Sequence, residues 1–288
     1  MSWLEVERGL AAELGSRAEA RWLVEEVFDR HRHAAPDQRL AELRALADRR
    51  LAGVPVQYVI GHWSFRTLEL SVDPRVLIPR PETEQVVEVG LAELERSASG
   101  RPDPVVADLG TGSGAIALSL AAEAQAAHPR LQVWATDVDD QALAVASLNR
   151  ARVGAADPRA AERVVLRRGS WWRALPPSLR GSLDLVVSNP PYVGEGEWAE
   201  LDAEVRLEPY GALVARDGRG GVAGLADVEA VVAGAPEWLA PSGALVVEIA
   251  PHQAGAAVAA ARRAGLREPR VDRDLAGRDR MLVARSPR

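Results

Sequence analysis

The amino-acid sequence predicts an α/β protein in which a mostly parallel sheet follows a small helical bundle and a connecting β-hairpin. Apolar residues first recur at helical spacing, then alternate over short stretches, and finally form apolar runs separated by helical segments. Strands that alternate with helices indicate parallel pairing through right-handed crossovers. We therefore expect a helical domain over residues 1–53, a hairpin over residues 54–80 and an α/β domain over residues 81–288.

The N-terminal domain is predicted to consist of helices. Leu, Trp, Val and Phe recur at helical spacing between Arg and Glu, and breaks fall near Gly15-Ser16 and at Pro36. Gly53 is placed to end the last helix. The polar positions hold no cluster of catalytic side chains, so we expect this domain to dock a substrate or to serve as a lid.

The connecting segment has a shorter apolar period. Val56, Tyr58 and Ile60 alternate with other residues, and further short extended pieces surround Gly61 and Asp73-Pro74. This pattern predicts extended pieces from residue 54 onward that form a hairpin.

A stiff polar run leads from the hairpin into a helix. The run is Ile78-Pro79-Arg80-Pro81-Glu82-Thr83-Glu84. Glu82 and Glu84 fall in the first turn, where the helix dipole favours acidic side chains. These two acids either serve only the helix or, with Arg80, form part of a functional loop.

The α/β domain is predicted to contain seven strands. They are expected near residues 105–107, 131–136, 164–166, 183–188, 244–249, 267–271 and 281–284. Four polar residues lie at the carboxyl ends of the first four strands: Asp108, Asp137, Ser170 and Asn189. Because ligands of such folds bind at the carboxyl ends of the strands, these residues mark the predicted site.

Composition narrows the possible function classes. The chain has 288 residues, 47% hydrophobic residues, no cysteine and a net charge of -6. The lack of cysteine excludes disulfides and cysteine nucleophiles, and no familiar metal-ligand spacing occurs, so no metal is expected. The negative charge argues against a broad phosphate-binding surface. No apolar run is long enough to span a bilayer and the N-terminus is unlike a signal peptide, so we expect a cytoplasmic protein without membrane contacts.

A glycine-rich turn follows the first predicted strand in the pattern Asp-x-Gly-x-Gly-x-Gly, which differs from that of dinucleotide-binding folds. Its candidate cofactor-binding residues are Asp108, Gly110, Thr111, Gly112, Ser113 and Gly114. Glycine lets the backbone approach a ligand, and the next helix offers free N–H groups. Asp137 is placed to accept hydrogen bonds from two ribose hydroxyls. The two carboxylates make the pocket anionic, which suits a sulfonium cofactor with an ammonium group better than a pyrophosphate.

The nucleoside of such a cofactor needs a flat apolar wall. Trp171 and Trp172 follow the third predicted strand, and either ring could instead belong to the core. We expect Trp171 to supply the wall.

The fourth predicted strand ends in Asn189-Pro190-Pro191-Tyr192. Proline fixes φ and has no N–H group, so this loop is stiff and leaves carbonyl groups free to accept hydrogen bonds. Asn189 Oδ1 and the Pro190 carbonyl could accept both N–H groups of a primary amide or exocyclic amine, and the Tyr192 ring could cover its plane. Alone, the tetrapeptide could be merely a turn. Beside a sulfonium cofactor it indicates methyl transfer to a planar nitrogen, by positioning and electrostatics and without a general base.

Together these residues resemble the release-factor glutamine methyltransferases (PrmC/HemK), a family of class I S-adenosylmethionine-dependent enzymes. The resemblance covers nearly the whole chain, through Pro55 to Tyr58 with Gly61, Val76 to Glu84, Asp108 to Gly114, Asn189 to Val193, Glu208-Pro209 with Ala212-Leu213, and Asp274 to Arg280. The Asn-Pro-Pro-Tyr motif is shared with adenine and other amino-methyltransferases. The Ile78 to Glu84 run and the helical N-terminus are specific to the glutamine enzymes.

The resemblance implies a Rossmann-like methyltransferase domain that methylates N5 of the glutamine in the Gly-Gly-Gln loop of class I peptide chain release factors. The implied cofactor is S-adenosyl-L-methionine, held by Gly110 to Gly114, Asp137 and Asn189, with Trp171 against its adenine. The implied glutamine site is Asn189, Pro190, Pro191 and Tyr192, of which Asn189, Pro190 and Tyr192 would be catalytic. A release factor is the expected partner, without direct nucleic-acid contact, and we expect a monomer.

Three positions depart from the family pattern. Ser170 stands where the family often has an aspartate, so a contact to the adenine amino group is expected to be weaker or replaced. The segment from Arg216 to Leu225 is expected to be longer and looser than the family's compact Gly-Gly-x-Asp-Gly-Leu. Ala250 replaces the glycine of Glu-Ile-Gly ahead of Gln253.

Other substrates and one other class stay open from the sequence. A ribosomal-protein glutamine, or an adenine or cytosine amine in nucleic acid, presents the same two N–H donors. Enzymes that act on nucleic acid must bind phosphates and extract a base, which the acidic balance does not favour. A non-catalytic nucleotide-binding or adaptor protein would use the loop only to grip a partner.

Overall fold

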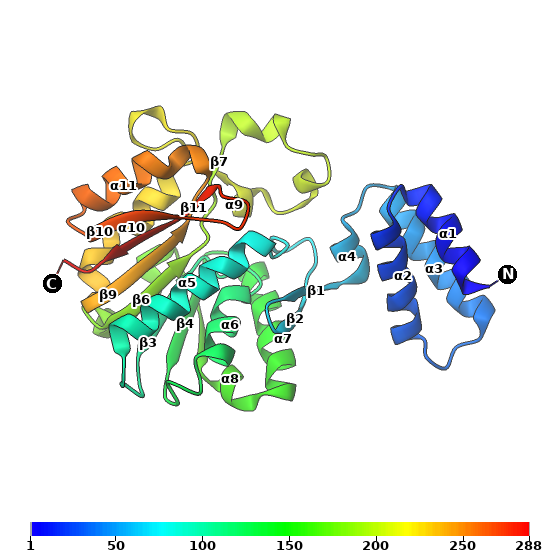
Figure 1. The fold of residues 1–288 in the computed structure, drawn as a ribbon, viewed down its shortest axis with the longest axis horizontal. Helices are drawn as coiled ribbons and strands as arrows, with labels where there is room; N and C mark the ends of the chain where they lie inside the picture. Colours follow the sequence, from blue (N-terminus) through cyan, green and yellow to red (C-terminus); the bar gives the residue numbers. More distant parts are fainter. Residues whose placement is uncertain (1, 288) are drawn as a thin grey trace.

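The computed structural model describes residues 2–287, and Figure 1 shows a helical bundle joined by a short hairpin to a larger α/β part. The bundle helices are α1 (Trp3–Leu14), α2 (Arg17–Arg30) and α3 (Pro36–Leu51). The hydroxyls of Ser2 and Ser16 cap α1 and α2 by accepting backbone N–H groups of the first turn. The predicted breaks near Gly15-Ser16 and at Pro36 are therefore confirmed.

The first part of the connecting segment corrects the sequence-based prediction. Val56–Ile60 forms a short helix, α4, and not an extended piece. Most of its side chains pack in the core of the bundle, whereas Tyr58 packs against residues of the connecting segment on the other side. Because this five-residue segment is apolar on both sides, the spacing of its apolar residues does not tell a helix from a strand. The hairpin is only β1 (His62–Phe65) and β2 (Leu68–Ser71).

The α/β part contains the predicted seven-stranded sheet, in the order β10-β11-β9-β6-β3-β4-β5. Its strands are β3 (Val105–Leu109), β4 (Gln132–Asp137), β5 (Val164–Arg168), β6 (Leu183–Ser188), β9 (Leu239–Glu248), β10 (Arg267–Arg273) and β11 (Asp279–Arg285). Pairing is parallel from β5 to β9, and β11 is antiparallel to both of its neighbours. This mostly parallel sheet confirms the predicted fold class. A separate parallel pair is formed by β7 (Val193–Gly194) and β8 (Val214–Ala215).

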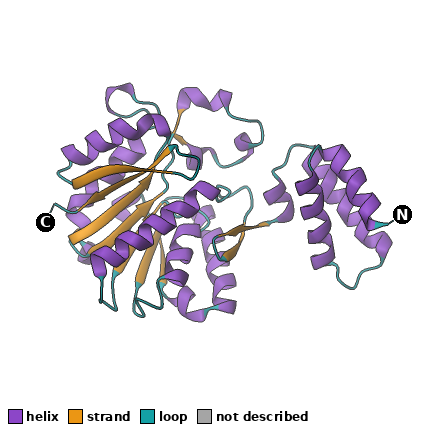
Figure 2. Cartoon of the chain, in the orientation of Figure 1, coloured by secondary structure: helices purple, strands orange, loops and turns teal. Residues whose placement is uncertain are grey.

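Helices cover both faces of the sheet, as Figure 2 shows. One face packs against α5 (Pro81–Ala98), α6 (Ala115–Glu123), α7 (Asp140–Ala156) and α8 (Pro158–Glu162). The other packs against α10 (Ala226–Trp238) and α11 (Ala254–Arg263). Along β6, Leu185 and Val187 enter the first core and Val186 the second, as the pleat of a strand requires.

Short helices lie in the connections of the α/β part. They are α9 (Tyr210–Leu213) and the 3-10 helices η1 (Trp171–Ala174), η2 (Pro177–Leu179), η3 (Glu195–Glu200), η4 (Val205–Leu207), η5 (Arg219–Gly221) and η6 (Pro251–Gln253). Among residues 2–287, no helix combines the length and the apolar character that crossing a bilayer requires.

The strand order reverses between β3 and β6. The chain runs outward from β3 through β4 to β5 and then returns to β6 on the other side of β3. In open α/β sheets, ligands bind in the crevice at the carboxyl ends of the strands where this reversal occurs. The glycine-rich turn follows β3 and Asn189 follows β6, so the topology brings the two principal predicted motifs to one edge.

Candidate active site

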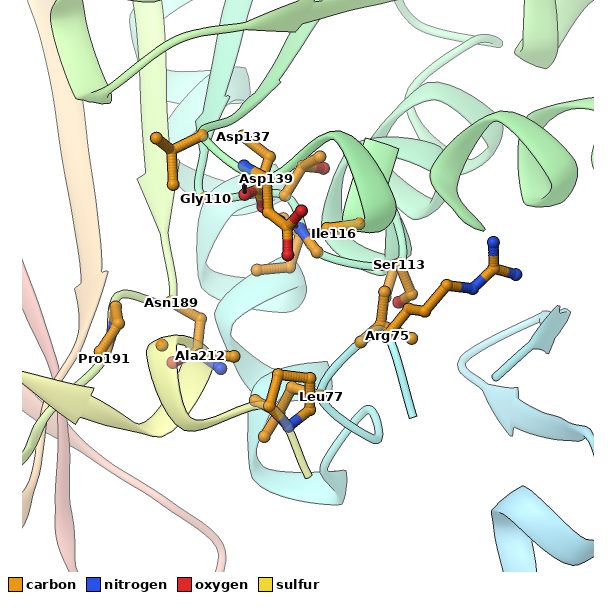
Figure 3. Close-up of a pocket in the computed structure, with 18 of the residues that line it drawn as sticks. Arg75, Leu77, Gly110, Ser113, Ile116, Asp137, Asp139, Asn189, Pro191 and Ala212 are labelled. Atoms are coloured by element: carbon orange, nitrogen blue, oxygen red, sulfur yellow. Dashed lines mark hydrogen bonds between the residues drawn. The ribbon is translucent and has the colours of Figure 1, made fainter. Parts of the chain in front are cut away.

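A cavity of about 480 Å³ opens at the carboxyl ends of the parallel strands, within the usual range for small-molecule sites. Nine predicted site residues line it: Gly110, Thr111, Gly112, Ser113, Asp137, Ser170, Trp171, Asn189 and Pro191. Figure 3 shows Gly110 and Asp137 on one side of the cavity, Asn189 and Pro191 on a second, and Leu77 facing them. The predicted residues outside this lining are Asp108, Gly114, Pro190 and Tyr192.

The glycine-rich turn is held against the end of β4. The N–H groups of Gly110 and Thr111 both donate to the carbonyl oxygen of Thr136, at 2.9 and 2.8 Å. Gly110 has a φ of 77°, and a Cβ atom there would lie 3.3 Å from the Trp171 ring. Glycine is therefore needed at this position for the backbone conformation and for the close approach of the indole.

Asp108 supports the turn from behind. Its Oδ2 accepts hydrogen bonds from the Thr111 hydroxyl at 2.6 Å and from the N–H of Ala117 at 3.1 Å. Burial raises the pKa of Asp108 to about 7, against the opposing effect of these two hydrogen bonds. The carboxyl group thus fixes the turn and the start of α6, and it does not line the cavity.

Asp137 lines the cavity at the end of β4. Its two carboxylate oxygens accept the N–H groups of Gly112 at 2.9 Å and Asp139 at 3.0 Å. Burial raises its pKa, and these hydrogen bonds oppose that shift. Each oxygen keeps a lone pair for another donor, so the geometry suits two hydroxyl groups. The predicted ribose contact stays a prediction.

The two neighbouring tryptophans, which the sequence left as alternatives, have different surroundings. Trp171 lines the cavity beside Asp227, which also lines it; burial raises the pKa of Asp227, whereas the Trp171 indole opposes that shift. Trp172 stacks on Trp238, with ring centroids 5.9 Å apart and an interplanar angle of 20°. Of the two rings, it is Trp171 that faces the predicted cofactor position.

Asn189 is connected to a buried carboxylate that sequence reasoning missed. Its Nδ2 donates to Thr83 Oγ1 at 3.2 Å, and the Thr83 hydroxyl donates to Glu248 Oε2 at 2.7 Å. The hydroxyl of Tyr192 donates to Glu248 Oε1 at 3.2 Å. Thr83 and Glu248 are both buried. Glu248 ends β9, so the strand-end argument that selected Asp137 and Asn189 could also have selected it.

The loop before α5 forms a second wall of the cavity. Arg80 lines it and forms an ion pair with the buried carboxylate of Glu208. Glu208 also accepts the N–H of Ile78 at 2.9 Å. Burial raises the pKa of Glu208, whereas the charge of Arg80 lowers it. Two segments far apart in sequence are thereby joined beside the cavity.

The two acids in the first turn of α5 serve the structure around the loop. Glu82 pairs with Arg278 at 2.8 Å, and Glu84 accepts the N–H of Arg66 at 3.0 Å. Neither is among the residues that line the cavity, in contrast to Arg80 and Thr83 of the same run. The alternative in which both acids belong to the functional loop is therefore not supported.

The segment from Arg216 to Leu225 is compact, which corrects the expectation of a loose loop. The N–H of Gly218 donates to the Val222 carbonyl at 2.8 Å, which closes the turn. A Cβ atom on Gly224 would lie 2.2 Å from the carbonyl oxygen of Tyr192. The segment therefore packs directly behind the Asn189 to Tyr192 loop. The lack of a side chain at Gly224 permits this close approach.

Comparisons with known proteins agree with this geometry. The PrmC N-terminal domain family matches residues 7–61, and the methyltransferase small domain family matches residues 89–207. A release factor glutamine methyltransferase from Bordetella pertussis is 43% identical over 273 residues, which cover 92% of this chain and 93% of that protein. This chain belongs to the release factor glutamine methyltransferase family. The match to the N-terminal domain extends to residue 61, in agreement with α4 as part of the bundle.

Further comparisons support membership of the release factor glutamine methyltransferases. A relative with that name from Moorella thermoacetica is 44% identical over 241 residues, covering 82% of this chain and 77% of that protein. The solved METTL16 MTase domain has a TM-score of 0.51 at 16% identity, covering 76% of this chain and 74% of that one. The latter likeness concerns the fold alone. The expected Rossmann-like methyltransferase fold and the expected enzyme class are confirmed.

Proposed function

We propose that this chain transfers a methyl group from S-adenosyl-L-methionine to the side-chain amide nitrogen of the Gly-Gly-Gln loop glutamine of class I peptide release factors. The names of its relatives support the release factor as substrate. The observation that carries the chemistry is the Asn189 amide, which lines the cavity while its Nδ2 is used by Thr83. Its Oδ1 is thus left as an acceptor for a substrate N–H group. A cytoplasmic monomer stays a prediction.

The cavity residues fit the proposed cofactor. Bound there, S-adenosylmethionine supplies an electrophilic methyl group on a positively charged sulfur. Gly110 and Gly112, both with positive φ, bring backbone close to the cavity, and Asp137 offers carboxylate lone pairs for the ribose. Trp171 offers a flat face for the adenine. Asp227 also lines the cavity, and its carboxylate oxygens can accept from the adenine amino group in place of the contact that the departure at Ser170 weakens.

The chemical task of the substrate site is to orient a poor nucleophile. An amide nitrogen delocalises its lone pair into the carbonyl, and it carries two N–H donors. Within residues 2–287, the Pro190 carbonyl oxygen and Asn189 Oδ1 accept no hydrogen bond. Asn189 lines the cavity, and Pro190 lies between the two lining residues Asn189 and Pro191, so we assign both oxygens as acceptors for these donors. Holding both hydrogens fixes the nitrogen and favours the positive charge that develops on it. After transfer the nitrogen is acidic and loses its proton to water, so no general base is required.

The experiment that tests this function uses labelled S-adenosylmethionine with a purified release factor and with the same factor carrying a replaced loop glutamine. We expect label only in the unaltered factor. Label in the altered factor would contradict the assigned target. A ribosomal-protein extract, DNA and tRNA serve as alternative acceptors, and we expect none of them to be labelled.

A variant of the loop separates catalysis from cofactor binding. We expect Asn189→Ala to lower kcat by about 10²-fold to 10³-fold, the range for removal of one preorganised hydrogen-bonding group. Calorimetry with S-adenosylhomocysteine measures the cofactor site independently of turnover. An equal loss of cofactor-product affinity would show that Asn189 acts mainly on the cofactor.

A further inference from the structure

An asparagine side chain can present either its oxygen or its amino group to a ligand. The two orientations differ by a half turn of the planar amide and occupy nearly the same volume. The choice decides the chemistry, because the oxygen accepts N–H donors and repels a carboxylate, whereas the amino group donates to a carboxylate. A site that uses Asn189 to distinguish an amide from an acid therefore needs a group that fixes its orientation.

Thr83 is such a group. A hydroxyl group has one hydrogen to donate. Thr83 Oγ1 lies 2.7 Å from Glu248 Oε2 and donates its hydrogen to it. A carboxylate is a stronger acceptor than a neutral amide oxygen, so this hydrogen is committed to Glu248. Thr83 Oγ1 can then only accept from Asn189, at 3.2 Å. The amino group of Asn189 must face Thr83, and its oxygen faces away.

Glu248 keeps the hydroxyl in this direction. Only 1% of its surface is exposed, so no bulk water competes for its oxygens. Glu248 Oε1 accepts a hydrogen bond from the Tyr192 hydroxyl at 3.2 Å, and Glu248 Oε2 accepts the one from Thr83. Burial raises the pKa of Glu248, whereas the hydrogen bonds from Thr83 and Tyr192 and the charge of Arg280 oppose that shift. In its ionised form the side chain has no hydrogen to donate, so it cannot reverse the hydrogen bond from Thr83.

We propose that Thr83 and Glu248 are positioning residues that make the site select a glutamine amide over a glutamate carboxylate, by fixing which end of Asn189 faces the substrate. The inference rests on the proposed function, because that function makes Asn189 the substrate contact. It adds two residues outside the Asn-Pro-Pro-Tyr loop and assigns them specificity rather than chemistry. Thr83 stands at the start of α5 and Glu248 at the end of β9, so two rigid elements set the orientation.

The test measures binding rather than turnover. Release factor with its loop glutamine, and the same factor with glutamate there, are titrated into enzyme saturated with S-adenosylhomocysteine. Wild-type enzyme is expected to favour glutamine by roughly tenfold to a hundredfold, the range for one hydrogen bond gained against one charge left unpaired. In Thr83→Val, Asn189 can turn freely, so most of this preference should disappear. Thr83→Ser retains the hydroxyl and should retain the preference.

Ser97→Ala provides the matched control. It also removes a hydroxyl of α5, but one that donates to the Glu93 carbonyl and lies outside the cavity lining, so the preference for glutamine should persist. An unchanged preference in Thr83→Val, or an equal loss in Ser97→Ala, would overturn the proposal. Affinity for S-adenosylhomocysteine reports whether each variant is folded.

A second variant covers the case in which Thr83→Val does not fold. Glu248→Gln keeps the shape of the side chain but adds an amino group that can donate to Thr83, so the preference for glutamine should fall severalfold. A preference equal to that of the wild type would contradict the proposal. If wild-type enzyme neither binds nor methylates the release factor, the proposed function fails and this inference fails with it. Methylation by the wild type with unaltered selectivity in the variants overturns the positioning role alone.

Discussion

At the scale of single residues, the site depends on buried carboxylates outside the cavity lining as well as on carboxylates that line the cavity. Asp108 and Glu248 are buried and bind hydroxyl or backbone groups of the functional loops. Asp137 and Asp227 line the cavity. Burial raises the pKa of all four carboxyl groups. The cause is the same for each: the folded protein removes part of the water that would stabilise the ionised carboxylate.

Asp108 should make stability depend on pH. Its pKa is raised from 3.8 to about 7 in the folded protein, so between these values the folded state keeps a proton that the unfolded chain has lost. Its contribution to the free energy of unfolding therefore falls as pH rises through this window. Asp108→Asn does not titrate, so its stability relative to the wild type should rise by up to about 1.4 kcal/mol per pH unit. Urea unfolding at pH 5, 6 and 7 measures this difference, and a difference independent of pH would refute it.

At the scale of elements, the packing of α5 on β6 sets the distance between Thr83 and Asn189. Its first turn carries Thr83, and further along it packs on β6, which ends next to Asn189. The contact is close at Gly90, where a Cβ atom would lie 3.3 Å from Val187 Cγ1 and 3.5 Å from Leu185 Cδ2. The small residue thus permits the spacing that the Thr83 to Asn189 hydrogen bond needs.

Enlarging Gly90 should move α5 away from the sheet. We expect Gly90→Val to lower the free energy of unfolding by about 1–3 kcal/mol, as overpacking of a core does, and to reduce the preference for glutamine over glutamate because Thr83 moves with the helix. Equilibrium unfolding and binding titrations with the two forms of the release factor measure the two effects. Gly9→Ala is the control, since Gly9 lies in α1 with no atom within 4 Å of its added Cβ. It should raise stability by up to about 1 kcal/mol. A neutral Gly90→Val would show that the helix can adjust.

At the scale of the whole molecule, the bundle and the α/β part have separate cores. A few specific contacts connect them. Glu26 of α2 hydrogen-bonds His62 of the hairpin at 2.6 Å, and Arg50 of α3 pairs with Glu204 at 3.3 Å. The cavity lies entirely within the α/β part and the loop before α5. Ligand binding should therefore stabilise one part more than the other.

Hydrogen exchange can detect this difference. With S-adenosylhomocysteine at one hundred times its Kd, amides of β3 and β6 that exchange by unfolding of the α/β part should gain about 2.7 kcal/mol of protection. Amides of α1 to α3 should be nearly unchanged, because their core does not include the cavity. Equal protection in both parts would show instead that the molecule unfolds as one cooperative unit.

The sequence by itself determined the features that depend on neighbours along the chain. Apolar period predicted the bundle and the seven strands, and position at strand ends predicted Asp137 and Asn189. The seven strands are confirmed, and Asp137 and Asn189 line one cavity because a parallel sheet places the carboxyl ends of its strands together. Their roles in binding stay predictions. The turn from Asp108 to Gly114 was equally local, since its glycines and its aspartate act within one strand-to-helix connection.

Only the tertiary structure decided the features that depend on contacts between distant segments. α4 is helical because it is buried between the bundle and the connecting segment, which no local period records. Trp171 and Trp172 are neighbours in sequence, and only packing against Trp238 separates their roles. Thr83 and Glu248 lie 165 positions apart, yet they share one hydrogen bond. The direction of the hydrogen bond between Asn189 and Thr83 depends on the partner of the Thr83 hydroxyl, which is Glu248. That partner is known only from the packing of α5 against the sheet.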